Sequence, residues 1–110
     1  MKWKIDYYNT NVQEAILKWP KKMLQRYLRI VDLIEKDGPD LGMPLTKSLE
    51  KGLFEIRIKA REGIGRAFFC YLIKSKIIVL HGFIKKTQKI PKKELDITRK
   101  RMKEVIKNEL

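Results

Sequence analysis

Hydrophobic and polar side chains alternate, or hydrophobic ones run together, in four stretches of the chain that predict short β-strands. The stretches are Lys2–Tyr8, Leu53–Lys59, Arg66–Ile73 and Ile77–Phe83. The third is apolar at nearly every position, which is typical of a central strand in a sheet. The last three follow closely along the chain, and their side chains sort into one apolar face and one face that carries several cations.

Apolar residues at three- and four-residue steps predict helices in the N-terminal half and at the C-terminal end. Residues 12–19 form the first such pattern. Pro20 interrupts it, so the sequence allows either one kinked helix or two helices that meet there. A second amphipathic pattern covers residues 21–36, and a last helix is expected from Pro91 to about residue 108.

The remaining long segment, residues 38–52, holds three of the six glycines and two of the four prolines. Such a composition predicts a loop with at most a short turn at 46–49. The expected order is therefore strand, one or two helices, three strands and a helix. This order predicts an α+β fold, a single domain over 1–110. Its small, mostly antiparallel sheet has the helices packed on one face and the other face left open.

The charge balance points to an anionic partner. Lys and Arg number 26 against 13 Asp and Glu, which leaves a formal net charge of +13. The excess concentrates toward the C-terminus, where residues 85–110 carry ten basic and four acidic groups. Nucleic acid or an acidic protein is the first candidate partner for such a chain. The alternative is a surface that is charged only for solubility.

Several other classes of protein are disfavoured. Cys70 is the single cysteine, so an intramolecular disulfide and a CxxC metal site are excluded. No His, Asp and Glu cluster has metal-ligand spacing, and we expect no metal ion. The N-terminus lacks the apolar stretch of a signal peptide, and no window approaches the length of a membrane span. A cytoplasmic location without membrane association is therefore expected.

An ordered set of short motifs gives the sequence its most specific signal. The motifs are a GL-x-E-x-R strand from Gly52, a G-x-x-R-x-FF strand from Gly63, and LHGF-x-KKTQK-x-P-x-x-E from Leu80 to Glu94. Each motif is weak alone, but the ordered set closely resembles the RelE/ParE toxin superfamily, in its phage-derived, HigB-like branch. About half of the chain takes part in this resemblance in detail.

The resemblance implies a RelE-like fold and a toxin of a type II toxin-antitoxin system. Toxins of the RelE and HigB kind are endoribonucleases that cut messenger RNA in the ribosomal A site, without a metal ion or an organic cofactor. The implied partners are a helix-turn-helix antitoxin (HigA-like), the ribosome and mRNA. The implied location is the bacterial cytoplasm.

Metal-free RNA cleavage needs an activated 2′-hydroxyl, a stabilised phosphorane and a protonated leaving oxygen. Arg66 resembles the phosphate-binding arginine of RelE-type enzymes, and its guanidinium suits two-donor contact with a phosphate. Arg57 matches a position that is basic in RelE and is expected to act as a base or charge stabiliser. The alternatives are a solvated Arg66, and an ion pair of Arg57 with Glu55 or Glu62.

The segment after the last strand supplies further candidates. In the superfamily this position often carries a second basic group near the leaving oxygen, which we assign to Lys86. RNA contacts are expected from Lys59, Lys85, Gln88 and Lys89. For the lysines of this segment the alternative is ordinary contact with solvent or the RNA backbone.

His81, the only histidine, is a candidate general acid or base because it titrates near neutrality. By alternation it shares a face with Ile77, Val79 and Phe83, so a core histidine is the alternative. RelE-type enzymes often place a C-terminal tyrosine in the site, and HigB-type enzymes can use acidic and histidine residues near the C-terminus. This C-terminal region has no tyrosine and no histidine, which leaves the acid and the base open.

Two other functions compete with the mRNA endonuclease. ParE-type members of the superfamily bind DNA gyrase and are not nucleases, so a protein-targeting toxin is one alternative. A non-catalytic basic RNA-binding domain is the other. The cations on the polar strand face favour the nuclease, because ParE-type members largely lack them.

Overall fold

The order of helices and strands agrees with most of the sequence prediction. The structure is a computed structural model and describes residues 2–109. Met1 and Leu110, the ends of the expected domain 1–110, lie outside them. The elements are β1 (Lys4–Tyr7), α1 (Thr10–Leu17), α2 (Lys21–Asp37), β2 (Thr46–Glu50), β3 (Leu53–Ala60), β4 (Gly63–Leu72), β5 (Lys76–Lys85) and α3 (Lys92–Glu109). No helix in the described part is long and apolar enough to cross a membrane.

The strands form one five-stranded sheet in the order β1-β5-β4-β3-β2. β1 runs parallel to β5, and the other neighbouring pairs are antiparallel. The predicted α+β class and mostly antiparallel sheet are therefore confirmed. The prediction of a loop at 46–49 is wrong, because β2 pairs with β3 from Thr46 to Glu50. This edge strand buries Thr46 but leaves Lys47 and Ser48 exposed, so its sequence lacks a strong apolar pattern.

Pro20 separates two helices. The Asn9 side chain caps α1 by accepting a hydrogen bond from the backbone N–H of Val12 at 2.9 Å. Pro20 stands at the N-cap of α2, where its missing N–H is no loss. Trp19, in the connection, is 7% exposed and joins the core. The two-helix alternative is thus the correct one.

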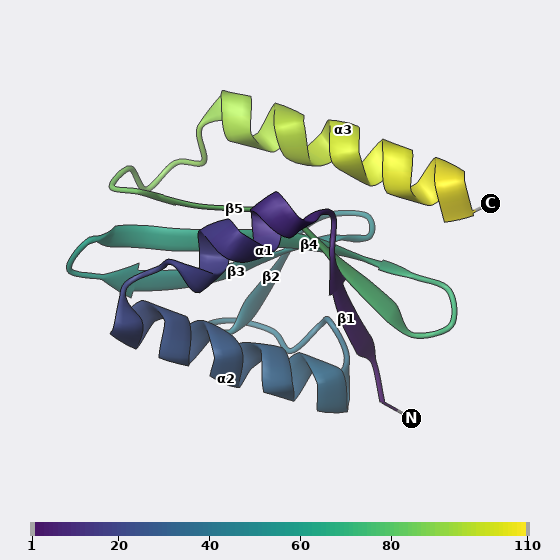
Figure 1. Cartoon of the computed structure of the whole chain (residues 1–110), viewed down its shortest axis with the longest axis horizontal. Helices are drawn as coiled ribbons and strands as arrows, with labels where there is room; N and C mark the ends of the chain where they lie inside the picture. Colours follow the sequence, from purple (N-terminus) through teal and green to yellow (C-terminus); the bar gives the residue numbers. More distant parts are fainter. Residues whose placement is uncertain (1, 110) are drawn as a thin grey trace.

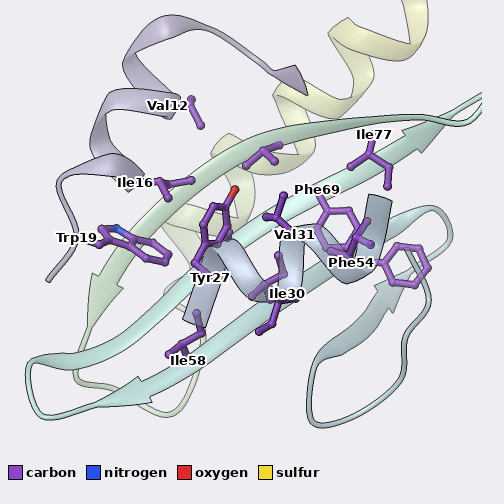
Figure 2. Packing of buried hydrophobic residues seen from close by; sticks show 14 of the residues in the cluster. Val12, Ile16, Trp19, Tyr27, Ile30, Val31, Phe54, Ile58, Phe69 and Ile77 are labelled. Carbon is purple, nitrogen blue, oxygen red and sulfur yellow. The ribbon is translucent and has the colours of Figure 1, made fainter. Parts of the chain in front are cut away.

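The helices cover both faces of the sheet, and the prediction that they pack on one face is wrong. α1 and α2 lie on one side and α3 on the other (Figure 1). Figure 2 shows the core on the first side, where Trp19 from the connection packs against Tyr27 from α2, and Phe69 from β4 belongs to the same cluster. On the second side α3 covers Leu53, Phe68, Cys70, Leu72, Ile78 and Leu80. Because β4 is apolar at nearly every position, both of its faces need a cover.

A β-bulge in β5 reverses the side-chain alternation near the histidine. Phe69 of β4 pairs with Val79, but Phe68 pairs with His81, so Leu80 is an extra residue. Val79 therefore faces the α1 and α2 side, whereas Leu80 packs under α3. The prediction that His81 shares a face with Ile77 and Val79 is therefore wrong. Of the three predicted neighbours, only Phe83 lies on the same face of the sheet as His81, the face that α3 covers.

Candidate nucleic-acid interface

A cation-lined pocket lies at the open edge of β3. β2 pairs only with Leu53–Ile56, so the second half of β3 has no strand on its outer side. The space between this edge, α2 and the loop before β2 forms a pocket of about 440 Å³, which we call the edge pocket. It is lined by Arg26, Arg29, Ile30, Met43, Pro44, Leu45, Thr46, Lys47, Glu55, Arg57 and Lys59.

The edge pocket has a large excess of positive charge. Its lining holds five cationic side chains (Arg26, Arg29, Lys47, Arg57 and Lys59) and one carboxylate, that of Glu55. Within residues 2–109 none of the five forms an ion pair. Arg26 does have a neutral partner, since its Nη1 donates a hydrogen bond to the Lys59 carbonyl oxygen at 2.8 Å. The pocket is therefore suited to an anionic ligand.

Glu55 is occupied by another arginine. Its Oε2 lies 3.2 Å from Arg66 Nε, and both side chains are buried, at 2% and 0% exposure. The ion pair lacks hydrogen-bond geometry, because neither atom has a hydrogen-bond partner in the described structure. Burial raises the pKa of the Glu55 carboxyl and lowers the pKa of the Arg66 guanidinium. Of the two expected partners for Arg57, neither forms an ion pair with it, and Glu55 pairs with Arg66 instead.

Arg66 also holds the segment that follows β5. Its Nη2 donates to the carbonyl oxygens of Thr87 and Gln88, at 2.9 and 2.6 Å. Residues 86–91, which we call the crossing segment, thereby pass over the guanidinium and bury it. Direct contact of Arg66 with a phosphate stays a prediction, and in this conformation the side chain does not reach solvent. The alternative of a solvated Arg66 disagrees with the structure.

The other expected RNA-binding residues lie on the surface around this contact. Lys85, Lys86, Gln88 and Lys89 are all exposed. Lys59 of β3 and Lys85 of β5 lie in one cross-strand row, each opposite Ile64 of β4. Two strand spacings separate them, roughly 10 Å. A cationic strip thus extends from the edge pocket across the end of the sheet.

His81 is turned toward α3 and away from the edge pocket. Its Nε2 lies 2.9 Å from Glu94 Oε1, and its Nδ1 lies 3.4 Å from Arg101 Nη1. Because the guanidinium only donates, Nδ1 accepts and Nε2 donates to Glu94. Both ring nitrogens are occupied, and the ring is 16% exposed. These contacts join β5 to α3; a role of His81 as acid or base stays a prediction.

The chemistry available at this surface is charge stabilisation. Arg57 stands opposite Arg66 in the β3–β4 register, but the Arg66 charge is paired with Glu55, so the positive charge offered to a phosphate at this position is that of Arg57. Among residues 2–109 no group of three or more His, Cys, Asp or Glu side chains is placed to hold a metal ion.

Three residues of the edge pocket escaped the sequence prediction. Arg26 and Arg29 are three residues apart on α2, on the side away from its apolar stripe, where cations are usually solvated. Lys47 lies on β2, the strand that the sequence predicts as a loop. Only the topology, which places α2 and β2 beside the edge of β3, brings them to Arg57.

The comparisons agree with the fold and the motifs. The family model described as "Phage derived protein Gp49-like (DUF891)" matches residues 14–103. The structure is similar to that of the E. coli toxin RelE, a double arginine mutant in the free state. That similarity has a TM-score of 0.57 at 12% identity and covers 96% of this chain and 100% of the other. Among curated proteins there is no significant sequence match. The fold is therefore RelE-like, and the chain belongs to the phage-derived Gp49-like family, a RelE/HigB-like family of toxins.

Proposed function

We propose that this chain is the toxin of a type II toxin-antitoxin system and cleaves mRNA on the ribosome without a metal ion. The observation that carries the proposal is the set of cations at the edge pocket and the adjoining strip, of which only Lys85 has a carboxylate partner among the described residues 2–109. Lys85 Nζ lies 3.9 Å from Glu94 Oε2 and is half exposed, so solvent screens this contact. Membership in a toxin family gives this surface its expected ligand, RNA.

In this mechanism the 2′-oxygen of one nucleotide attacks the adjacent phosphorus, and the 5′-oxygen of the next nucleotide leaves. The products are a 2′,3′-cyclic phosphate and a free 5′-hydroxyl. Arg57 stabilises the charge of the phosphorane, because its guanidinium lines the pocket and has no ion pair within residues 2–109. Lys59 and Lys85 hold the flanking phosphates, and Lys86 remains the candidate beside the leaving oxygen.

Arg66 serves as a positioning residue in this proposal. Its contacts with Thr87 and Gln88 fix the backbone of the crossing segment, which carries Lys86, Gln88 and Lys89. The partners of the proposed toxin are the ribosome, mRNA and a helix-turn-helix antitoxin, in the bacterial cytoplasm.

The test is induction of the chain in bacteria, followed by primer extension on a reporter mRNA with and without its start codon. We expect cuts only in the translated message, and we expect Arg57→Ala to abolish them. Arg61→Ala is the matched control, since it removes an exposed arginine of the same strand pair at the β3–β4 turn. Cuts that persist in Arg57→Ala, or that disappear equally in both variants, would remove Arg57 from the mechanism.

A protein-targeting toxin is the second candidate, and an exposed apolar surface favours it. Tyr71, Ile73 and Ile106 are 45%, 68% and 37% exposed, and with Leu72 and Glu109 they line an apolar hollow of about 300 Å³. Apolar patches of this kind often contact proteins. Growth arrest without any mRNA cuts would select this candidate.

A further inference from the structure

The edge pocket combines two surfaces that a bare phosphate site does not need together. Part of its lining, which we call the apolar wall, consists of Ile30 of α2 and of Met43 and Leu45 of the loop before β2. The rest of the lining includes the cations of β2, β3 and α2. A volume of about 440 Å³ falls within the usual range for small-molecule sites. The ligand should therefore have an apolar body and a strongly anionic end.

Beside Lys59, which is assigned above to a flanking phosphate, three of the cations are available to that anionic end. Arg26 is committed to the Lys59 carbonyl, but Arg29, Lys47 and Arg57 have neither an ion pair nor a side-chain hydrogen bond within residues 2–109. Lys47 and Arg57 lie on the same face of the sheet as Glu55, because Lys47 stands opposite Glu55 and Arg57 follows Glu55 by two residues on β3. Two guanidinium groups and an ammonium match phosphate oxygens, which arginine binds with two parallel donors.

The apolar wall is accessible rather than sealed in the core. Met43 is 61% exposed and Leu45 is half-buried, whereas Ile30 at 7% exposure closes the inner end. Methionine is flexible and polarisable and adapts to flat ligands. A nucleobase is such a ligand, and its flat surface would cover the exposed part of Met43.

An acidic peptide is the competing ligand, because a free strand edge can pair with an added strand. The edge of β3 is partly closed to that mode, since Arg26 Nη1 already occupies the carbonyl oxygen of Lys59. The apolar wall also faces the pocket from α2 and the loop, so it offers no continuation of the sheet.

We infer that the edge pocket is a nucleotide subsite for single-stranded RNA. It holds one unstacked base against Met43 and Leu45, and the phosphate of that nucleotide on Arg29 and Lys47. This inference rests on the proposed function for its ligand class and adds to it a subsite outside the strand face, on the α2 side of Arg57.

The experiment measures binding without cleavage or ribosomes. The probe is a fluorescein-labelled RNA trinucleotide with 2′-O-methyl groups, which cannot be cut because the attacking hydroxyl is blocked. Its affinity is measured by fluorescence anisotropy over a range of salt concentrations, beside the same probe with an abasic central residue. We compare Lys47→Ala with Lys103→Ala, an exposed lysine on α3, and Met43→Ser with Ile73→Ser, an exposed apolar residue at the other end of the molecule.

Each part of the pocket has its own expected result. Lys47→Ala weakens binding about tenfold and lowers the slope of log K against log salt by about 0.7, the value for one phosphate contact with a single strand. Met43→Ser weakens binding about fourfold and leaves that slope unchanged, because it removes apolar contact only. Lys103→Ala and Ile73→Ser bind like the wild-type chain. The abasic probe binds the wild type and Met43→Ser equally.

Three results would overturn the inference. The first is equal binding of the intact and abasic probes by the wild-type chain, which would reduce the site to bulk electrostatics. The second is an equal effect of Lys47→Ala and Lys103→Ala. The third is a decaglutamate peptide that binds more tightly than the trinucleotide and is weakened by the same pocket variants. Since the probe cannot be cut, a chain that binds it as expected but cleaves no mRNA would refute the proposed function and leave the subsite standing.

Discussion

Replacement of Arg66 by alanine should strongly destabilise the folded protein, whatever it does to a catalytic step. The substitution removes a side chain with 0% exposure, two hydrogen bonds to the carbonyls of residues 87 and 88, and the ion-pair partner of the buried Glu55. Breaking a buried pair by removing one partner costs about 3–5 kcal/mol. A domain of this size has a free energy of unfolding of about 5–15 kcal/mol. Arg66→Ala should therefore lose a large part of the total stability.

The assay is urea unfolding of the wild type, Arg66→Ala, Glu55→Leu and the double variant Glu55→Leu/Arg66→Met. With a urea dependence of about 2 kcal/mol per molar, a loss of 4 kcal/mol lowers the midpoint by about 2 M. Glu55→Leu should also be destabilising, because it leaves the buried guanidinium unpaired. The double variant should be more stable than either single one, since no unpaired charge remains on that pair.

A change in the unfolding free energy of less than about 1 kcal/mol for Arg66→Ala, a value typical of a surface substitution, would refute the buried and paired state of Arg66. So would a double variant that is the least stable of the set. In either case the burial and pairing of Arg66 would not describe the protein in solution. If the expected loss is found, a loss of toxicity in Arg66→Ala alone is no evidence for contact with RNA.

Two further predictions concern the two cores. A Cβ at Gly82 would lie 2.5 Å from Cγ1 and 2.6 Å from Cδ1 of Ile16 on α1. Gly82→Ala should therefore lower the free energy of unfolding by about 1–3 kcal/mol, and Ile16→Val in the same chain should restore part of that loss. A Gly82→Ala variant as stable as the wild type would contradict this packing. Burial raises the pKa of the Cys70 thiol from 9.0 to about 11, so the unfolded chain loses this proton first and the Cys70 contribution to stability falls as pH rises between those values. The wild type should lose stability relative to Cys70→Ala over that range, and iodoacetamide should modify the native thiol only at the rate of unfolding; rapid modification at neutral pH would refute its burial.

The sequence predicted the helices and strands that have a hydrophobic pattern within their own residues. Strand alternation and helical periodicity located β1, β3, β4, β5 and α3, and Pro20 marked the boundary between α1 and α2. β2 was missed because an edge strand with one buried residue, Thr46, needs no alternation. The placement of α3 was missed because the apolar residues of β4 were assigned to one face, although a strand without polar positions has two faces to cover.

The candidate site was predictable only in part. Arg57 is recognisable from strand parity and from the family motif, and Lys59 from strand parity alone; both line the edge pocket. The burial of Arg66 was not predictable, because it depends on the path of the crossing segment and on the carbonyls of Thr87 and Gln88. The bulge at Leu80 likewise leaves no periodic signal, and it alone decides which way His81 faces.

The central claim is that Arg57 serves ribosome-dependent cleavage of RNA, and a reconstituted reaction tests it most directly. Purified chain is mixed with ribosomes stalled on a defined mRNA with an empty A site, and with the same mRNA free in solution. We expect cuts in the ribosome-bound message alone, with 2′,3′-cyclic phosphate ends identified by mass spectrometry. We also expect a loss of about a hundredfold or more in rate for Arg57→Ala, with Arg61→Ala unchanged. No cleavage by a folded chain, or equal cleavage by wild type and Arg57→Ala, would contradict the central claim.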